Sequence, residues 1–341
     1  MVKAGIIGTG KTIGIASMHL NGYQRTEGVE LTAIYDIKPE AAREWCKRHE
    51  LSEDLICETL DEFWGKVDAV SICTPNYLHI HYIKEALKNG KHVLCEKPLC
   101  TEVEDMDEIE RLCKESPMVT AIGFNYRFIP MYITAKKLVE SGVLGDIILY
   151  RHSMGGARFA DPNIILEWRT DRDRSGAGSF IDFGSHAMYL LDFIVGIGNM
   201  EFKIFENTLI KQRELDGEKK NVTNDDVSVF IGKAENGMLA SFVTTRVGGF
   251  DTGLEIIGTN ASIKVANDVT ICYKSENPFA PAKFEEYRGE HYVEPLDIGR
   301  TLPSCVPSFV KAIETGGEPD CDISYGVKIH KVLFGIEAQV L

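Results

Sequence analysis

Short apolar runs alternate with helix-forming segments over residues 4–121, and this alternation constrains the fold more than any other feature of the chain. The runs lie at 4–7, 31–35, 55–57, 69–72, 92–95 and 119–121. Continuous apolar strands are typical of a parallel sheet buried on both faces, and the intervening helices supply right-handed crossovers. The pattern predicts a doubly wound α/β fold, which binds nucleotides at the carboxyl ends of its strands.

Residue 123 marks a change of pattern. Before it, helices are expected over 40–48, 79–88 and 102–114. After it, a helix over 130–141 and a strand over 147–152 precede an irregular stretch that runs to residue 178. The later apolar segments are separated by turn residues and are expected to be antiparallel strands: 200–207, 227–232, 238–246, 255–257, 262–265 and 269–273.

We therefore predict two domains. Residues 1–123 would form a Rossmann domain, and residues 124–341 an α+β domain with an open antiparallel sheet. The last helix has one apolar face and could pack back on the first domain.

The composition narrows the class of ligand. The formal net charge of −14 and the lack of a basic run argue against nucleic acid or an anionic membrane, so a small molecule is expected. The nine cysteines are odd in number and contain no Cys-x-x-Cys pair, which favours a reducing compartment and no zinc site. No stretch approaches the ~20 apolar residues of a membrane span. We expect a cytoplasmic protein.

A glycine-rich segment follows the first apolar run and opens a helix. Its expected contacts to a pyrophosphate are Gly8, Gly10, Lys11, Thr12, Ile13 and Gly14. Asp36 ends the second run, 22 residues after Gly14, where a carboxylate can accept both ribose hydroxyls of an adenosine and repel a 2′-phosphate. This predicts NAD over NADP. Two alternatives stay open: Asp36 could cap the helix at Pro39, and Lys38 could approach a 2′-phosphate.

Further motifs resemble the Gfo/Idh/MocA family, whose members include inositol dehydrogenases and glucose-fructose oxidoreductase. They are Thr74-Pro75-Asn76-Tyr77-Leu78-His79, Glu96-Lys97-Pro98, the segments 123–128, 142–145 and 167–169, Asp182-Phe183-Gly184-Ser185-His186, and 254–259. The resemblance runs in order through nearly the whole chain.

The resemblance implies catalytic roles for Lys97, Asp182 and His186. Hydride would pass between nicotinamide and a secondary hydroxyl of a sugar, glycoside or cyclitol. His186 would accept the hydroxyl proton, Lys97 would donate to the same oxygen, and Asp182 would orient His186 or bind a neighbouring hydroxyl. Histidine suits a base near neutral pH, and lysine suits a developing alkoxide. Whether Lys97 or His186 is the base stays open.

The same resemblance implies other contacts. Cofactor contacts would come from Thr74, Asn76, His79, Glu96, Lys97 and Arg169, and substrate contacts from Lys97, Tyr126, Arg127, Trp168, Asp182 and His186. His79 could instead be a cap or a surface residue, Arg169 could face Asp171 or Asp173, and Tyr126 and Arg127 could form a domain-interface pair. No metal site is expected.

Two departures from the family pattern stand out. The segment 10–19 is longer than usual, and Tyr189 stands where many relatives have an acid three residues after the histidine. The family's open sheet implies a homodimer or homotetramer. Two other functions remain: an enzyme that retains NAD and oxidises its substrate transiently, giving epimerisation, elimination or glycoside cleavage, and a non-catalytic NAD or sugar sensor.

Overall fold

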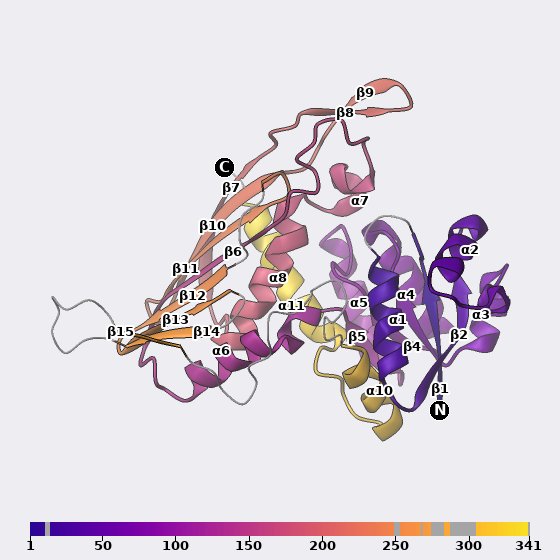
Figure 1. Ribbon diagram of the computed structural model, residues 1–341, viewed down its shortest axis with the longest axis horizontal. Helices are drawn as coiled ribbons and strands as arrows, with labels where there is room; N and C mark the ends of the chain where they lie inside the picture. Colours follow the sequence, from indigo (N-terminus) through magenta and orange to yellow (C-terminus); the bar gives the residue numbers. More distant parts are fainter. Residues whose placement is uncertain (11–13, 249–252, 267–268, 274–282, 287–304, 340–341) are drawn as a thin grey trace. The chain divides into compact units, whose positions relative to one another are not determined.

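The computed structural model describes all residues except 11–13, 249–252, 267–268, 274–282, 287–304 and 340–341 (Figure 1). These residues form two compact units. The first contains residues 1–125 and 303–331, and the second contains 126–302 and 332–341. The sequence placed residues 124–341 in the second domain, with the last helix able to pack back on the first, and the structure groups residues 303–331, including the start of that helix, with the first unit.

The first unit is built on a parallel sheet of five strands in the order β2-β1-β3-β4-β5. The strands are β1 Val2–Ile7, β2 Val29–Tyr35, β3 Ala69–Ile72, β4 His92–Cys95 and β5 Thr120–Ile122. The helices are α1 Ile15–Arg25, α2 Pro39–Arg48, α3 Leu60–Lys66, α4 His79–Lys88 and α5 Glu104–Glu115. The strand order reverses at β1 and β3, so the loops after these strands border the crevice where such sheets bind ligands. The predicted Rossmann class is confirmed.

The prediction of a strand at 55–57 is wrong. Glu53–Leu55 forms a single 3-10 turn (η1), because the Ser52 hydroxyl accepts a hydrogen bond from the Asp54 backbone N–H. Ile56 makes one isolated parallel bridge to Ile34 and no ladder. The sheet therefore has five strands instead of six.

The returning segment packs on this sheet, with its first helix against α1, β1 and β4 and the residues around 321 against the edge strand β5. It holds α10 Val306–Thr315 and the start of α11 Ile323–Glu337. The Ile122 N–H donates to the Cys321 carbonyl at 2.9 Å, and a Cβ at Gly326 would lie 2.8 Å from the Ile122 side chain. Glycine at position 326 thus lets α11 approach β5 closely.

Nine free cysteines serve mainly as small core residues. Cys46, Cys57, Cys73, Cys95, Cys100, Cys113, Cys305 and Cys321 are buried in the first unit, and Cys272 is half-buried in the second. Burial raises the pKa of the Cys73 and Cys95 thiols well above the ordinary value. Among the described residues, no group of His, Cys, Asp or Glu could hold a metal ion. No helix of the described chain is long and apolar enough to cross a membrane.

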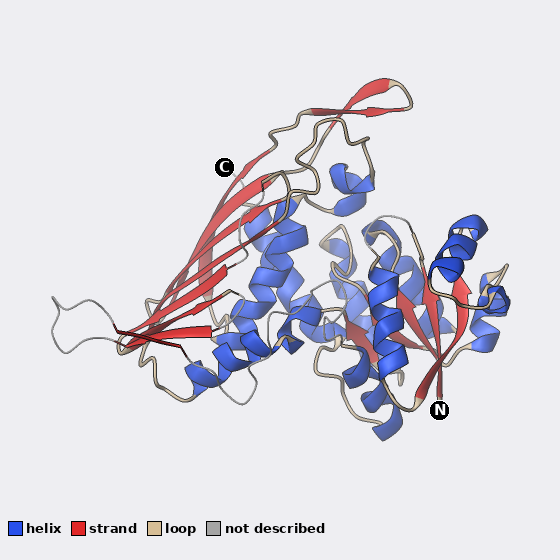
Figure 2. Cartoon of the chain, in the orientation of Figure 1, coloured by secondary structure: helices blue, strands red, loops and turns tan. Residues whose placement is uncertain are grey.

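The second unit contains an extended sheet, drawn in red on the left of Figure 2. It has eight strands in the order β15-β14-β13-β12-β6-β11-β10-β7. Its strands are β6 Ile147–Gly155, β7 Met200–Asn207, β10 Val227–Ala234, β11 Leu239–Thr245, β12 Gly253–Gly258, β13 Ala261–Val265, β14 Val269–Tyr273 and β15 Lys283–Glu286. β6 runs parallel to β11. The expected antiparallel sheet is thus present, with the pairing of β6 and β11 as its parallel exception among the described strands.

One face of this sheet packs against α6 Pro130–Glu140 and α8 Ser179–Ile194. α8 is apolar on almost every side because it lies between the sheet and α6. The strands follow the period of two: Phe230 and Phe242 point inward, and Val229 and Ile231 point outward and are exposed.

An unpredicted hairpin, β8 Gln212–Leu215 and β9 Glu218–Asn221, precedes β10. Its two-residue turn, Asp216-Gly217, has positive φ at both positions. An Asp-Gly pair between two strands is the usual signal for such a turn. The strands themselves are too polar to stand out by hydropathy.

Candidate functional site

The glycine loop follows β1 and leads into α1. Gly8 has φ +91°, and a Cβ there would lie 2.9 Å from the backbone of Cys73 and Thr74. Gly14, with φ +68°, is the N-cap of α1, so no side chain caps the helix from this position. The first turn of α1 also carries no acidic residue. A glycine loop that a ligand can approach closely, followed by a helix N-terminus with free N–H donors, fits the binding of a pyrophosphate. Gly10 has open space around its Cα, and Lys11, Thr12 and Ile13 lie outside the described residues.

Asp36 joins the end of β2 to this loop. Its Oδ2 accepts hydrogen bonds from the Thr9 N–H at 2.8 Å and the Thr9 hydroxyl at 2.9 Å. Its Oδ1 accepts from the Lys38 N–H at 2.9 Å, just before α2. The carboxylate is partly exposed beside the glycine loop. A partly exposed carboxylate at the end of the second strand fits recognition of a ribose.

Lys97 directly follows a buried carboxylate at the end of β4. Glu96 is 6% exposed, and its Oε1 lies 2.9 Å from His19 Nε2 and 3.3 Å from Asn125 Nδ2. His19 Nδ1 lies 2.8 Å from the Ser71 hydroxyl, which connects α1 and β3 to the same network. Glu96, which the sequence assigned to the cofactor, thus has contacts that hold the Lys97 turn to the core. Lys97 itself is half-buried.

His79 lies on the other side of the Lys97 turn. It is 1% exposed, so it is not a surface residue, and it is the first residue of α4 without capping that helix by its side chain. Its Nδ1 lies 2.6 Å from the Pro98 carbonyl oxygen, and its Nε2 lies 2.9 Å from the Thr74 carbonyl oxygen. Burial lowers the pKa of His79. The imidazole therefore links the loop after β3 to the loop after β4.

The loop after β3 also offers polar atoms toward a ligand. The Thr74 hydroxyl is buried and has no hydrogen-bond partner among the residues that the structure describes, and Asn76 begins a 3-10 turn, η2 Asn76–Leu78. Buried polar groups are usually paired, so an orphaned hydroxyl beside the glycine loop fits contact with a bound cofactor. The first unit therefore brings Gly8, Asp36, Thr74 and Lys97 to the loops after neighbouring strands.

In the second unit, α8 carries Asp182 and His186 one helical turn apart. His186 is 9% exposed, and its Nδ1 lies 2.8 Å from the Tyr189 hydroxyl. The Tyr126 ring stacks on the imidazole, with centroids 4.3 Å apart and planes 14° from parallel. Arg127 takes a different position, with its guanidinium 4.7 Å above the Phe193 ring. Tyr126 is thus grouped with His186, and Arg127 packs on the C-terminal half of α8.

Arg169 lies in a short turn, η4 Trp168–Thr170, that Glu167 and Thr170 cap reciprocally. Its guanidinium lies 4.0 Å above the Trp168 ring and 3.5 Å from a Glu167 oxygen, so Arg169 pairs with Glu167 instead of Asp171 or Asp173. Burial, with help from nearby Arg158, lowers the pKa of Arg169 to about 10. The negative charges of Glu167 and Asp182 raise the pKa of Arg169, so Asp182 lies close enough to interact electrostatically with this guanidinium.

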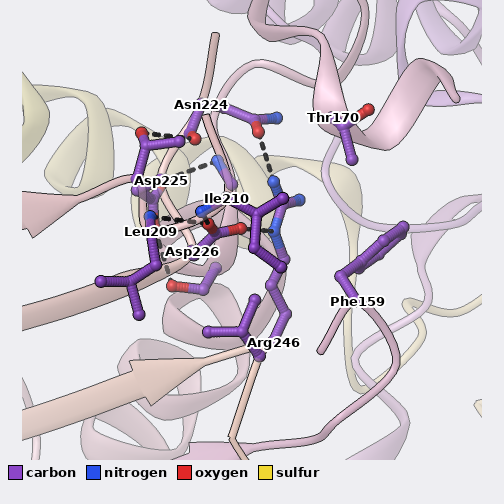
Figure 3. Close-up of polar contacts among 12 residues, drawn as sticks. Phe159, Thr170, Leu209, Ile210, Asn224, Asp225, Asp226 and Arg246 are labelled. Atoms are coloured by element: carbon purple, nitrogen blue, oxygen red, sulfur yellow. Dashed lines mark hydrogen bonds and ion pairs between the residues drawn. The ribbon is translucent and has the colours of Figure 1, made fainter. Parts of the chain in front are cut away.

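A buried polar network fixes this turn and the start of α8 (Figure 3). The Arg169 carbonyl accepts hydrogen bonds from Asn224 Nδ2 at 2.7 Å and from Arg246 Nη1 at 2.6 Å. Asn224 Oδ1 accepts a second bond from Arg246, whose Nε lies 3.7 Å from Asp226. Asp225 accepts from the N–H groups of Gly178 and Phe180 at 2.6 and 2.8 Å. Sequence reasoning missed this Asn-Asp-Asp run, because Asn and Asp before a strand indicate a turn and do not reveal a contact with a distant helix.

Comparison with known proteins adds the family context. Residues 2–124 match the oxidoreductase family with an NAD-binding Rossmann fold, and residues 132–264 match the GFO/IDH/MocA C-terminal domain. Levoglucosan dehydrogenase of Pseudarthrobacter phenanthrenivorans is 28% identical over 265 residues, which are 72% of this chain and 66% of that relative. Myo-inositol 2-dehydrogenase of Thermotoga maritima is 25% identical and aligns over 93% of this chain and 90% of its own length.

Solved structures share the fold. A levoglucosan dehydrogenase in complex with NADH and L-sorbose superposes with a TM-score of 0.87 at 24% identity, covering 99% of this chain and 96% of that one. An oxidoreductase domain protein from Kribbella flavida gives a TM-score of 0.86 at 25% identity, with the same coverage. Both units of the chain therefore have counterparts in one protein.

Proposed function

Because the chain belongs to the Gfo/Idh/MocA oxidoreductase family and carries its NAD-binding Rossmann domain, we propose that it is an NAD-dependent dehydrogenase. It transfers a hydride between nicotinamide and a secondary hydroxyl of a sugar, glycoside or cyclitol. The observation that most supports this reaction is His186, held by Tyr189 and Tyr126 one turn after Asp182. The relatives named for levoglucosan, myo-inositol and 1,5-anhydro-D-fructose support a polyhydroxylated ring as substrate.

The first unit holds the cofactor. Bound NAD supplies the hydride acceptor at nicotinamide C4. Gly8, Gly14 and the N-terminal donors of α1 hold the pyrophosphate, and Asp36 accepts the adenosine ribose hydroxyls. The Asp36 carboxylate repels a 2′-phosphate, which favours NAD over NADP. Thr74, Asn76 and Arg169 add polar contacts, and Glu96 and His79 serve the cofactor by fixing the turn of Lys97.

The chain's own groups handle the proton. His186 accepts the hydroxyl proton at Nε2 while Lys97 donates a hydrogen bond to the same oxygen, where negative charge develops as hydride leaves. Asp182 orients a neighbouring hydroxyl of the substrate, with Tyr126 and Trp168 as apolar walls. The uncovered face of the eight-stranded sheet, with Phe205, Val229 and Ile231 exposed, is the expected interface of a homodimer or homotetramer.

Replacing Lys97 with Ala tests this proposal. We expect turnover to fall by a factor of about 100 or more, because a donor aimed at a developing oxyanion is lost. The affinity for NADH, measured by fluorescence, should change by less than about twofold, because Lys97 acts in the transition state and contributes little to binding the cofactor. The substrate is first identified by NAD reduction across a panel of sugars and inositols.

Lys91→Ala is the matched control. Lys91 lies in the same unit, and its Nζ donates to the Val67 carbonyl at 2.8 Å, away from the candidate site. Its loss should leave turnover unchanged. Unchanged turnover in Lys97→Ala would contradict the catalytic assignment. Protein purified with tightly held NAD that turns over without an acceptor would instead favour the retained-cofactor reaction.

A further inference from the structure

We propose that Tyr189 is the positioning residue that orients His186, in the place where a carboxylate would ordinarily do so. The inference deepens the proposed function and rests on His186 as a proton acceptor. Tyr189 is fully buried on α8, three residues after His186. Its hydroxyl is the group that contacts His186 Nδ1, at 2.8 Å.

The phenol is itself fixed by the backbone. The Tyr126 N–H donates a hydrogen bond to the Tyr189 oxygen at 3.0 Å. This bond comes from η3 Asn125–Phe128, whereas the phenol comes from α8, so two elements define the position of one oxygen. The Tyr126 ring stacks on the imidazole at 4.3 Å. His186 is thus restrained in its plane by Tyr189 and across its face by Tyr126.

The proposed role requires the tautomer of His186 that is protonated at Nδ1. A phenol oxygen has two lone pairs, and the Tyr126 N–H uses one of them. The second lone pair can accept the His186 Nδ1–H. In that tautomer Nε2 carries the ring's lone pair and is the nitrogen that accepts a proton. A carboxylate would fix the same tautomer but would add a negative charge beside the ring, whereas the phenol orients the ring without that charge.

The second unit contains a similar pair that serves as an internal control. Tyr150 and His152 lie on β6, both are buried, and the Tyr150 hydroxyl lies 3.4 Å from His152 Nδ1. Burial lowers the pKa of His152 to about 3, and its buried Nε2 has no hydrogen-bond partner within the described part of the chain. This pair is part of the sheet core. Removing the Tyr150 hydroxyl should lower the stability of the fold about as much as removing the Tyr189 hydroxyl, without changing the surroundings of His186.

The experiment compares Tyr189→Phe with Tyr150→Phe in the full-length protein. Nitrogen NMR of histidine-labelled protein distinguishes a protonated ring nitrogen from one with a lone pair, and a spectrum of His186→Asn assigns the His186 signals. We expect wild-type His186 to be protonated at Nδ1 near pH 8. Tyr189→Phe should lose this preference and lower kcat about tenfold to a hundredfold, with NADH affinity within about twofold.

The control and a rescue variant complete the test. Tyr150→Phe should change neither the His186 signals nor kcat. Tyr189→Glu restores an acceptor for Nδ1–H, so it should recover the tautomer and part of kcat relative to Tyr189→Phe. This recovery keeps the test decisive if Tyr189→Phe is poorly folded.

The two proposals fail differently. Unaltered His186 signals in Tyr189→Phe, or a kcat loss as large in Tyr150→Phe, would overturn the positioning role. An altered tautomer with unchanged kcat would uphold the positioning role and overturn His186 as the proton acceptor.

Discussion

Asp36 binds the glycine loop with one carboxylate oxygen and the start of α2 with the other. The carboxylate is therefore oriented before any ligand arrives, with its remaining lone pairs directed by Thr9 and Lys38. Because a pre-oriented acceptor loses little entropy on binding, Asp36 should contribute both affinity and discrimination. The neighbouring Lys38 enters this arrangement through its backbone N–H.

We predict that Asp36→Ala relaxes the choice of cofactor. The KM for NAD should rise about tenfold or more, because a charged hydrogen bond to the ribose is lost. Activity with NADP should rise in the same variant, since the repulsion of its 2′-phosphate disappears. Thr9→Val is the control: it removes one bond to Asp36 and keeps the carboxylate. Equal losses with NAD and NADP would show that Asp36 does not contact the ribose.

The sequence could locate the site residues that belong to local motifs. Gly8, Asp36 and Lys97 each lie just after a strand, and Gly14 is the N-cap of the helix that follows the first strand. Their supporting contacts could not be predicted. The contact of Glu96 with His19 joins residues 77 apart, and no spacing rule predicts such a pair.

At the scale of elements, α8 depends on a cap from a distant segment. Gly178, its N-cap residue, has no side chain, and a Cβ there would lie 1.8 Å from the Asp225 carbonyl oxygen. Asp225 supplies the missing acceptor from just before β10, and its Oδ2 also accepts from the Ser179 hydroxyl at 2.7 Å. The helix that carries Asp182 and His186 is thus anchored at its first turn.

We predict that Asp225→Ala lowers the stability of the second unit by about 2 kcal/mol or more, because several buried donors lose their acceptor. It should also lower kcat, since the first turn of α8 frays beside Asp182. Thr59→Ala is the matched control: Thr59 caps α3 by accepting from the Glu62 N–H at 3.2 Å. It should cost about 1 kcal/mol in urea unfolding and leave kcat intact.

Elements with strong local signals were predictable, and elements defined by pairing were not. The strands 200–207 and 269–273 have the predicted bounds. The parallel pairing of β6 with β11 depends on the order of the strands in the sheet. The alternation of apolar residues does not reveal the direction of a strand, because it reads the same both ways.

The whole molecule contains several buried histidines, and these predict its response to acid. Burial lowers the pKa of His152 to about 3 and that of His330 to about 4, from an ordinary 6.5. The unfolded chain therefore binds more protons than the folded chain as the pH falls below 6.5. Stability is full above that value and declines as the pH falls toward the folded-state values.

We predict that each of these two histidines costs about 2 kcal/mol of stability between pH 7 and pH 5, since one pKa unit corresponds to about 1.4 kcal/mol. The measurement is the urea midpoint at both pH values. His152→Phe should reduce the pH dependence of the transition that reports the second unit. An identical pH dependence in the variant would contradict the burial argument.

At this scale the return of residues 303–331 to the first unit could be anticipated only for the last helix. The bond from the Ile122 N–H to the Cys321 carbonyl joins residues far apart in the sequence, and no local pattern predicts it. Only the apolar face of the last helix hinted at a partner. Which unit that face would contact depends on the shape of both.

The distribution of the cysteines gives the chain an internal chemical probe. Eight thiols lie buried in the first unit, and the ninth, Cys272, is half-buried in the second. A buried thiol with a raised pKa reacts with an alkylating reagent only when its surroundings open. Mass spectrometry of modified peptides over time would therefore measure local opening at the buried thiols of the first unit, in the protein alone and with any candidate ligand present.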